Sequence, residues 1–434
     1  MKAVALIIVL FISSLSFSQG VLTFEEVIQK TLEYNFDIRI VRNSAEQIAN
    51  LNNIGNAGYL PKVSVNADQN FGVANTRQEF ISGQVNDVNG AKSQALSANM
   101  RLDWTFFDGF TMFAADKRLQ LQEDAATLNV SAQVEMTLYQ VSVLYHSIQL
   151  QSQMTAVFEE ALELTRQRFQ LLTLKRKNGA ASELALLQAK MDLASDSANL
   201  IAQQKSIREM KLNLALLMGN AREINFNLST ASTPQVEINR ASISKQALDQ
   251  NTTLLIEKSN VAIRDMQRKE LQGRYFPQLN LYGQYAFGTS QSQAGFLVSN
   301  RSLGPSFGIS LKWNILDRLS TFTELKNNSL QQEVAALYVE KKSQMIANEL
   351  QAAFDNYDYA KQLYELDQNS LLDAEEIYVI ARKSYVNGAI TDLELREIQF
   401  SVIQTKNRQL SATLALQTSI LDLWLLSGDF KKML

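Results

Sequence analysis

Few residues of this chain could support metal or acid–base chemistry. The 434-residue sequence has no cysteine and a single histidine, His146. Thiol chemistry and disulfides are therefore excluded, and soft metal ligands are scarce. A structural role for His146 is the simpler interpretation, because no second histidine can join it within one chain. A three-fold axis could bring three copies together only if the residue faced a lumen.

Other patterns of chemical function are also lacking. No serine, histidine and carboxylate stand at the spacing of a catalytic triad, and no glycine-rich phosphate loop occurs. The sequence therefore predicts no enzyme, no cofactor and no metal site. The formal net charge is −3, with 41 basic and 44 acidic residues, so nothing favours nucleic acid as a partner.

The first residues have the pattern of a secretory signal. Lys2 precedes an apolar stretch, 3–12, that is too short to span a bilayer. Residues 1–18 are predicted to be removed before Gln19. No cysteine follows the apolar stretch, so attachment as a bacterial lipoprotein is not expected. No later run of about 18 apolar residues is evident, so no transmembrane helix is expected and a β-barrel remains the way to span a membrane.

The chain repeats itself once. The tripeptide Leu-Asp-Trp at 102–104 recurs as Leu-Lys-Trp at 311–313. Asn-Gly-Ala at 178–180 recurs at 387–389, and both offsets are 209 residues (311 − 102 and 387 − 178). Anchors in the same order at one offset indicate two tandem copies of one unit.

An earlier pair of anchors has a different offset. Tyr-Leu-Pro at 59–61 matches Tyr-Phe-Pro at 275–277 with an offset of 216 (275 − 59). The two offsets differ by seven residues (216 − 209). We place this difference in length within 74–94 and 289–303, which we expect to be variable loops.

Each copy is predicted to contain two β-strands. From Leu96 to Phe106 apolar and polar residues alternate, as expected where the two faces meet different solvents. Alternation alone also fits a half-buried sheet in a soluble sandwich. Two hairpins cannot close a barrel, whereas three chains would supply about twelve strands, with apolar residues outside and polar residues inside. The predicted strands are 62–73, 95–107, 277–288 and 304–315.

Two tryptophans stand near the ends of equivalent predicted strands. Trp104 belongs to the first copy and Trp313 to the second. In a membrane-spanning barrel these positions would suit an aromatic belt at the membrane surface.

Very long helices follow the strands. No proline occurs within about 110–177 or 318–386, and apolar residues recur every three or four positions, as in a coiled-coil seam. About 68 residues make a helix about 100 Å long, which exceeds a globular core. Return helices are predicted at about 182–218 and 391–427, so each copy should form a long helical hairpin.

The turns of these hairpins have residues that end one helix and begin the next. Gly179 and Gly388 are placed as C′ glycines. Ser182 and either Thr391 or Asp392 can cap the returning helices.

These motifs, in this order, resemble those of the TolC family of outer-membrane efflux proteins. In the second copy, Arg318 stands where the family usually has a glycine. The resemblance covers the opening helix, the helix-to-strand entries, the strand-to-helix exits and the helical tips, which read LTFEEVIQKTLEYNFDI (22–38), YLPKVSV (59–65) and YFPQLNL (275–281), LDWTFFDGF (102–110) and LKWNILDRL (311–319), KNGAASELALLQAK (177–190) and VNGAITDLELREIQ (386–399).

The resemblance implies a membrane α+β fold. A homotrimer would form a 12-stranded transmembrane β-barrel, four strands per protomer, continued by a periplasmic α-helical barrel. The protein would lie in the outer membrane, in contact with its lipid, with a large periplasmic part. The implied segments are repeat 1 at 19–219, an equatorial linker at 220–240, repeat 2 at 241–428 and a C-terminal tail at 429–434.

The implied function is a passive exit duct of a tripartite efflux pump. Such a duct passes small molecules to the exterior and opens when a periplasmic adaptor (membrane fusion protein) and an inner-membrane pump of RND or ABC type engage it. The exit duct of a type I protein secretion system has the same fold and remains an alternative. A secreted coiled-coil scaffold without a pore is an alternative from another class, although it leaves the alternating strands unexplained.

The resemblance also points to a constriction. Alignment on Gly388 places Glu394 and Glu397 where the family narrows its tunnel with acidic residues. In a trimer each position would form a ring of three carboxylates, which favours cations and raises the pKa of its members. As ordinary solvated helix residues, the two glutamates would have no such role.

Further tip residues are candidates for closing the tunnel and for docking. Glu183, Asp392 and Arg396 could form inter-helix ion pairs. Ile390 stands where an arginine lock would be expected, so that lock is absent, and Tyr385 is either a further partner or part of the seam. The expected adaptor-docking residues are Asn178, Gly179, Ala180, Asn387, Gly388 and Ala389.

Overall fold

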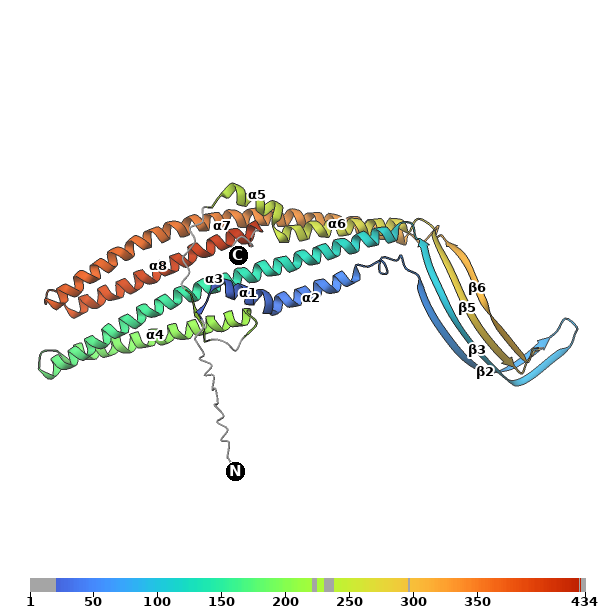
Figure 1. Cartoon of the computed structure of the whole chain (residues 1–434), viewed down its shortest axis with the longest axis horizontal. Helices are drawn as coiled ribbons and strands as arrows, with labels where there is room; N and C mark the ends of the chain where they lie inside the picture. The colour runs from blue at the N-terminus through green and yellow to red at the C-terminus, as the bar shows by residue number, and fades with distance from the viewer. Residues whose placement is uncertain (1–20, 221–224, 230–237, 296, 429, 431–434) are drawn as a thin grey trace, which may run out of the picture. The chain divides into compact units, whose positions relative to one another are not determined.

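The computed structural model describes residues 21–220, 225–229, 238–295, 297–428 and 430 (Figure 1). The predicted signal peptide lies outside these residues, as do most of the predicted C-terminal tail and parts of the predicted linker. The chain forms two compact units. The helical unit is Met1–Arg42, Val130–Thr252 and Ser343–Leu434, and the sheet unit is Asn43–Asn129 and Thr253–Lys342.

The sheet unit contains one four-stranded antiparallel sheet in the order β2-β3-β5-β6 (Figure 1). The pairing of β3 with β5 joins the hairpin of the first copy to that of the second. Among the described residues, β2 pairs only with β3 and β6 only with β5, so these two strands are edges. The strands are β2 Lys62–Glu79, β3 Val85–Phe107, β5 Gln278–Ser292 and β6 Ser299–Lys312.

The two faces of this sheet differ in chemistry. Val65, Met100, Tyr285 and Pro305 lie in one row of one face, and the neighbouring rows of that face are also apolar. On the other face the side-chain amide of Asn66 donates to that of Asn99 at 3.1 Å. An apolar surface of this extent indicates contact with a partner or a membrane. Its exposed members include Val63, Val65, Met100, Tyr285, Phe307, Ile309 and Leu311.

Both hairpins are longer than the sequence predicts. We expected loops at 74–94 and 289–303, but pairing continues to Glu79 opposite Val85 and to Gln291 opposite Ser299. That prediction was wrong because backbone pairing needs only a partner strand, whereas apolar alternation, the signal we used, fades in these polar stretches. The turn of the longer hairpin is short, and Gly83 has a positive φ of 80° there.

The exit from the last strand also differs from the prediction. The strand predicted at 304–315 ends at Lys312, and the next helix begins at Ser320 instead of about 318. Arg318 and Leu319 have φ of 59° and 61°. This left-handed conformation excludes both residues from a right-handed helix.

In the first copy, close backbone contact stabilises the equivalent exit. Gly109 has a φ of 73°, and a Cβ there would lie 2.2 Å from the carbonyl oxygen of Gly273. A Cβ on Gly273 would lie 2.2 Å from Oγ1 of Thr111. Both positions therefore require glycine.

The two predicted belt tryptophans make matching contacts. Nε1 of Trp104 donates to the carbonyl oxygen of Tyr59 at 2.9 Å, and Nε1 of Trp313 donates to that of Tyr275 at 3.0 Å. Each indole therefore ties the end of a hairpin to the chain just before that hairpin begins. Both rings remain partly exposed, at 38% and 54%.

Four helices form the two long hairpins (Figure 1). The 67-residue helices α3 and α7 each have residues in both units. The first hairpin is α3 Thr111–Lys177 with α4 Glu183–Leu217, and the second is α7 Ser320–Val386 with α8 Asp392–Ser427. These bounds lie within two residues of the predicted ones.

A buried cluster forms the core of the helical unit, and the short elements of the chain are divided between the two units. Val27, Tyr145, Leu214 and Leu421 belong to one buried cluster that joins α1, α3, α4 and α8. Asparagines after α1 and α5 make matching contacts, because Nδ2 of Asn35 donates to the carbonyl oxygen of Leu217 and Nδ2 of Asn251 to that of Leu426. The short elements are β1 Val21–Leu22, α1 Phe24–Tyr34, α2 Phe36–Leu51, β4 Asn227–Leu228, α5 Arg240–Gln250 and α6 Thr252–Gly273.

Among the described helices, α8 alone is long and apolar enough to cross a membrane by length and composition. No such run was expected from the sequence. Leu421 and Leu423 are buried within the chain, as is 44% of the apolar window. Packing within the helical unit therefore explains the apolar character of α8.

Candidate functional site

The two turns at the tips of the helical hairpins have the same backbone. Gly179 and Gly388 have φ of 74° and 73°. The N–H of Ala180 donates to the carbonyl of Lys175 at 2.8 Å, and the matching bond of the second turn has the same length. This pattern is a Schellman motif, which needs the left-handed glycine. All six predicted docking residues are exposed, and a Cβ on either glycine would meet nothing within 4 Å.

The return helices begin with different caps. Ser182 accepts a hydrogen bond from the N–H of Ala185 at 3.1 Å. Thr391 forms a full capping box, in which its Oγ1 accepts from the N–H of Glu394 at 3.3 Å and its N–H donates to Oε2 of Glu394 at 2.6 Å. The predicted constriction residue Glu394 is therefore part of a helix cap.

The cap changes the titration of Glu394. Hydrogen bonds from the backbone and then the hydroxyl of Thr391 hold the pKa of Glu394 below its usual value. This direction, seen within one chain, is opposite to the rise that we expect for a ring of carboxylates. Glu397 lies three residues further along α8 and is also exposed.

Arg168 of α3 joins three helices. Its guanidinium lies 2.7 Å from Oδ2 of Asp192 on α4 and 2.5 Å from Oδ2 of Asp392 on α8. Only 11% of the Arg168 side chain is exposed. Burial by itself would lower the pKa of Arg168, but hydrogen bonds to Asp392 and Asp192 outweigh burial and raise this pKa. Arg168 therefore remains charged and links the first hairpin to the second.

Arg396 of α8 makes a second link between the hairpins. Its Nη2 lies 2.7 Å from Oδ1 of Asp196 on α4, and its Nη1 lies 3.2 Å from Oγ1 of Thr165 on α3. The Thr165 hydroxyl donates to the other oxygen of Asp196 at 2.7 Å. Because 9% of the Asp196 side chain is exposed, this carboxylate depends on these partners in place of water.

One residue pair occupies the same place in both tips but differs in chemistry. In the first tip Nε of Arg176 lies 2.8 Å from Oε2 of Glu183, in a pair that is 46% and 60% exposed. In the second tip the equivalent positions are Tyr385 and Asp392, whose hydroxyl and Oδ1 lie 3.4 Å apart. Burial, and then the charge of Asp392, raise the pKa of Tyr385.

The predicted ion-pair residues therefore have different surroundings. Glu183 forms an exposed pair within one hairpin, whereas Asp392 and Arg396 form partly buried pairs between hairpins. Their partners were not predicted from the sequence. One signal was available in the sequence, because Asp192 and Asp196 are four residues apart and therefore lie on the same face of their helix. The missed residues are Thr165, Arg168, Arg176, Asp192 and Asp196.

His146 occupies a structural position. Its ring stacks on that of Phe24, with 5.8 Å between centroids, and its Nδ1 has no hydrogen-bond partner in the part of the chain that the structure describes. Burial lowers the pKa of His146, although a hydrogen bond with Gln149 opposes this. No group of three or more metal-ligating residues occurs among the described residues.

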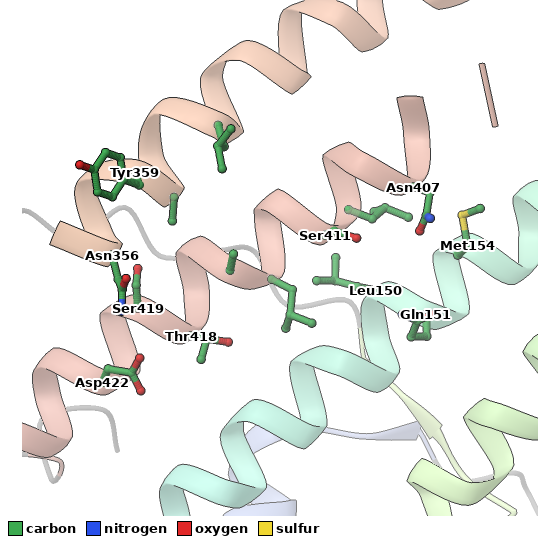
Figure 2. Close-up of a pocket in the computed structure, with 15 residues that line it drawn as sticks. Leu150, Gln151, Met154, Asn356, Tyr359, Asn407, Ser411, Thr418, Ser419 and Asp422 are labelled. Atoms are coloured by element: carbon green, nitrogen blue, oxygen red, sulfur yellow. The ribbon is translucent and has the colours of Figure 1, made fainter. Parts of the chain in front are cut away.

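A groove of about 500 Å³ lies between α3, α7 and α8 (Figure 2). Leu150 and Met154 line it from α3, and Tyr359 lines it from α7. Among its lining residues only Asp422 is charged, and this carboxylate accepts a hydrogen bond from the hydroxyl of Tyr139 at 2.6 Å. The groove therefore suits an apolar surface better than an ion.

Comparison with known proteins gives one family over most of the chain. The model of the family described as outer membrane efflux protein matches residues 27–220 and 243–429. The chain is 20% identical over 410 residues to the probable outer membrane lipoprotein SilC of Salmonella typhimurium, covering 93% of this chain and 85% of SilC.

Solved structures share the fold. The CmeC outer membrane channel of Campylobacter jejuni has a TM-score of 0.80 at 18% identity, over 94% of this chain and 85% of CmeC. A membrane protein from Pseudomonas aeruginosa has a TM-score of 0.77, also at 18% identity, over 93% of this chain and 90% of that one.

Proposed function

Since the chain belongs to the outer membrane efflux protein family and is located in the outer membrane, we propose that it is the exit duct of a tripartite efflux pump. The family match confirms the resemblance to TolC proteins seen in the sequence. In the proposed duct, small molecules pass from the periplasm or the pump to the exterior.

The observation that carries this proposal is the incomplete sheet. Among the described residues, β2 and β6 are unpaired edges, and one face of the sheet exposes apolar side chains. Such edges and such a face are unfavourable in a soluble monomer. If β6 paired with β2 of another chain, as β3 pairs with β5, three chains would close a 12-stranded barrel with the apolar face toward lipid.

Matching contacts in the two copies support a pore of repeated units. The Trp104–Tyr59 and Trp313–Tyr275 hydrogen bonds recur, as do the two asparagine contacts after α1 and α5. In the proposed homotrimer, the tandem copies supply equivalent strands and helical hairpins around one axis, and the tryptophans form an aromatic belt at the membrane surface.

The tip is the proposed gate. The links made by Arg168 and Arg396 hold α8 against α3 and α4, so the tunnel is narrow at rest and passes only a small ion current. A periplasmic adaptor would dock on the exposed turns at 178–180 and 387–389, and an inner-membrane pump of RND or ABC type would supply energy.

Rings of Glu394 and Glu397 are the proposed constriction. The test is the cation selectivity of the channel in planar bilayers with Glu394→Gln and Glu397→Gln. Glutamine can also serve in a capping box, so Glu394→Gln removes charge while it keeps the cap. Unchanged currents and selectivity would remove both residues from the constriction.

The architecture is tested by assembly in the outer membrane. Met100→Arg places a charge further into the apolar face and should hinder insertion by roughly 2–4 kcal/mol if the residue lies near the bilayer midplane. Asn66→Arg on the polar face is the matched control and should insert. The expected wild-type result is a trimer in the outer-membrane fraction, measured as native mass corrected for detergent. A soluble monomer, or equal insertion of both variants, would contradict the barrel.

A further inference from the structure

We propose that the polar face of the sheet carries a basic band, made by Lys62, Arg101 and Lys312, that attracts anionic solutes to the base of the barrel. This inference rests on the proposed function, because the polar face must line a lumen. The band would act as a selectivity element of opposite sign to the carboxylates of the helical tips.

The strand register brings these residues to one end of the sheet. Lys62 begins β2 and lies opposite Asp103 of β3, and Lys312 ends β6. Asp103 lies opposite Tyr282, which lies opposite Gly308, so one row crosses all four strands. Lys312 is four residues from Gly308 and therefore shares its face.

Arg101 lies in the next row of the same face, opposite Ser64, and residues of the first row hold it in place. Its Nε lies 2.9 and 2.8 Å from the two carboxylate oxygens of Asp103. Its Cζ lies 5.4 Å from the ring centroid of Tyr282, in a cation–π contact. The Tyr282 ring in turn lies against Gly308, where a Cβ would come within 2.6 Å of the phenol oxygen. The guanidinium is therefore positioned before any solute arrives.

The charge of the band is positive. Its three cations share these rows with one carboxylate, Asp103, and the next acidic residue on the same face is Asp68, further along β2 opposite Ser97. The Arg101 side chain remains 41% exposed, and both lysines are exposed. In a trimer the excess of cations would occur three times around one lumen, and a charged ring in a narrow pore concentrates ions of opposite sign.

Ion selectivity in planar bilayers tests this inference. The reversal potential is measured across a KCl gradient for the full-length wild type, for Lys62→Gln/Lys312→Gln and for Lys92→Gln. Lys92 lies opposite Val73 on the apolar face and is the matched control. We expect the chloride-to-potassium permeability ratio to fall by about twofold or more in the double variant and to stay unchanged in the control.

The outcomes separate the band from the duct. A conducting double variant with the wild-type ratio would overturn the basic band and leave the duct intact. An equal fall in the Lys92→Gln control would also overturn the band, since charge on the apolar face would then matter as much. If the wild type, assembled in the membrane, conducted neither at rest nor with Arg168→Ala, the duct itself would be wrong and the inference would fall with it.

Discussion

The two helical tips share a backbone but differ in how their side chains connect. Both turns have a left-handed glycine with the same hydrogen bonds. In the first tip, Glu183 pairs with Arg176 of its own hairpin at the surface. In the second tip, Asp392 pairs with Arg168 of the other hairpin. The turn geometry is therefore common, while the links that could hold a gate belong to the second tip.

One difference between the tips contributes to these pairings. The place of Arg176 in the first copy is taken by Tyr385 in the second, seven residues before the acidic residue in each case. An arginine neutralises the acid locally, whereas a tyrosine leaves its negative charge in place. Asp392 can therefore attract Arg168 across the helices.

The largest test of this comparison is removal of each arginine in turn. Arg168→Ala leaves Asp192 and Asp392 without their cation in a partly buried site, and should cost about 2–3 kcal/mol of local stability. Arg176→Ala removes only an exposed pair and should cost about 0–1 kcal/mol. Amide hydrogen exchange in the first turns of α4 and α8 measures both effects.

The same variants test the gate. If the links hold the tunnel closed, Arg168→Ala should raise the resting conductance in planar bilayers, and Arg176→Ala should not. Equal exchange and equal conductance in both variants would show that the two tips do not differ in the way we infer.

The second test concerns the link between Arg396 and Asp196. Each single change, Arg396→Ala or Asp196→Ala, should destabilise the tip, and a double-mutant cycle should give a coupling of about 1–3 kcal/mol, because the pair is mostly buried. Thermal unfolding of the solubilised protein provides the four values. Coupling below about 0.5 kcal/mol would mean that the pair does not tie α8 to α4.

Local features of the fold could be predicted from the sequence, whereas the ion-pair partners between helices could not. Gly179 and Gly388 indicated the turns because a left-handed helix end strongly favours glycine. Arg168 gave no such signal, because its partners depend on how three helices are rotated against one another. Arg318 shows a further limit, since it adopts the left-handed backbone of the equivalent Gly109 against the preference of its own residue type.

The third test asks whether the tips also differ in docking. Gly179→Ala and Gly388→Ala should each lower the stability of the tip by about 1 kcal/mol, because both glycines have a positive φ. The two losses should be similar, because an added Cβ meets nothing within 4 Å at either site. A bulkier residue at Gly388 should also impair export without loss of trimers. Drug accumulation in cells lacking the native duct measures export. Normal export with the bulky residue would argue against docking at that tip.

The smallest test uses the cap, which only the second tip closes with a carboxylate. Because the folded state lowers the pKa of Glu394, its ionised form stabilises the cap above the usual value of 4.5, and that contribution is lost as pH falls through the lowered pKa. Exchange protection of the first turn of α8 should therefore decline below about pH 4.5 in the wild type. Glu394→Gln keeps the capping box but has no carboxylate to protonate, so exchange protection should decline less in this variant. All other carboxylates are the same in both proteins, so the difference between them isolates Glu394. Identical pH profiles would show that the carboxylate of Glu394 does not stabilise the second tip.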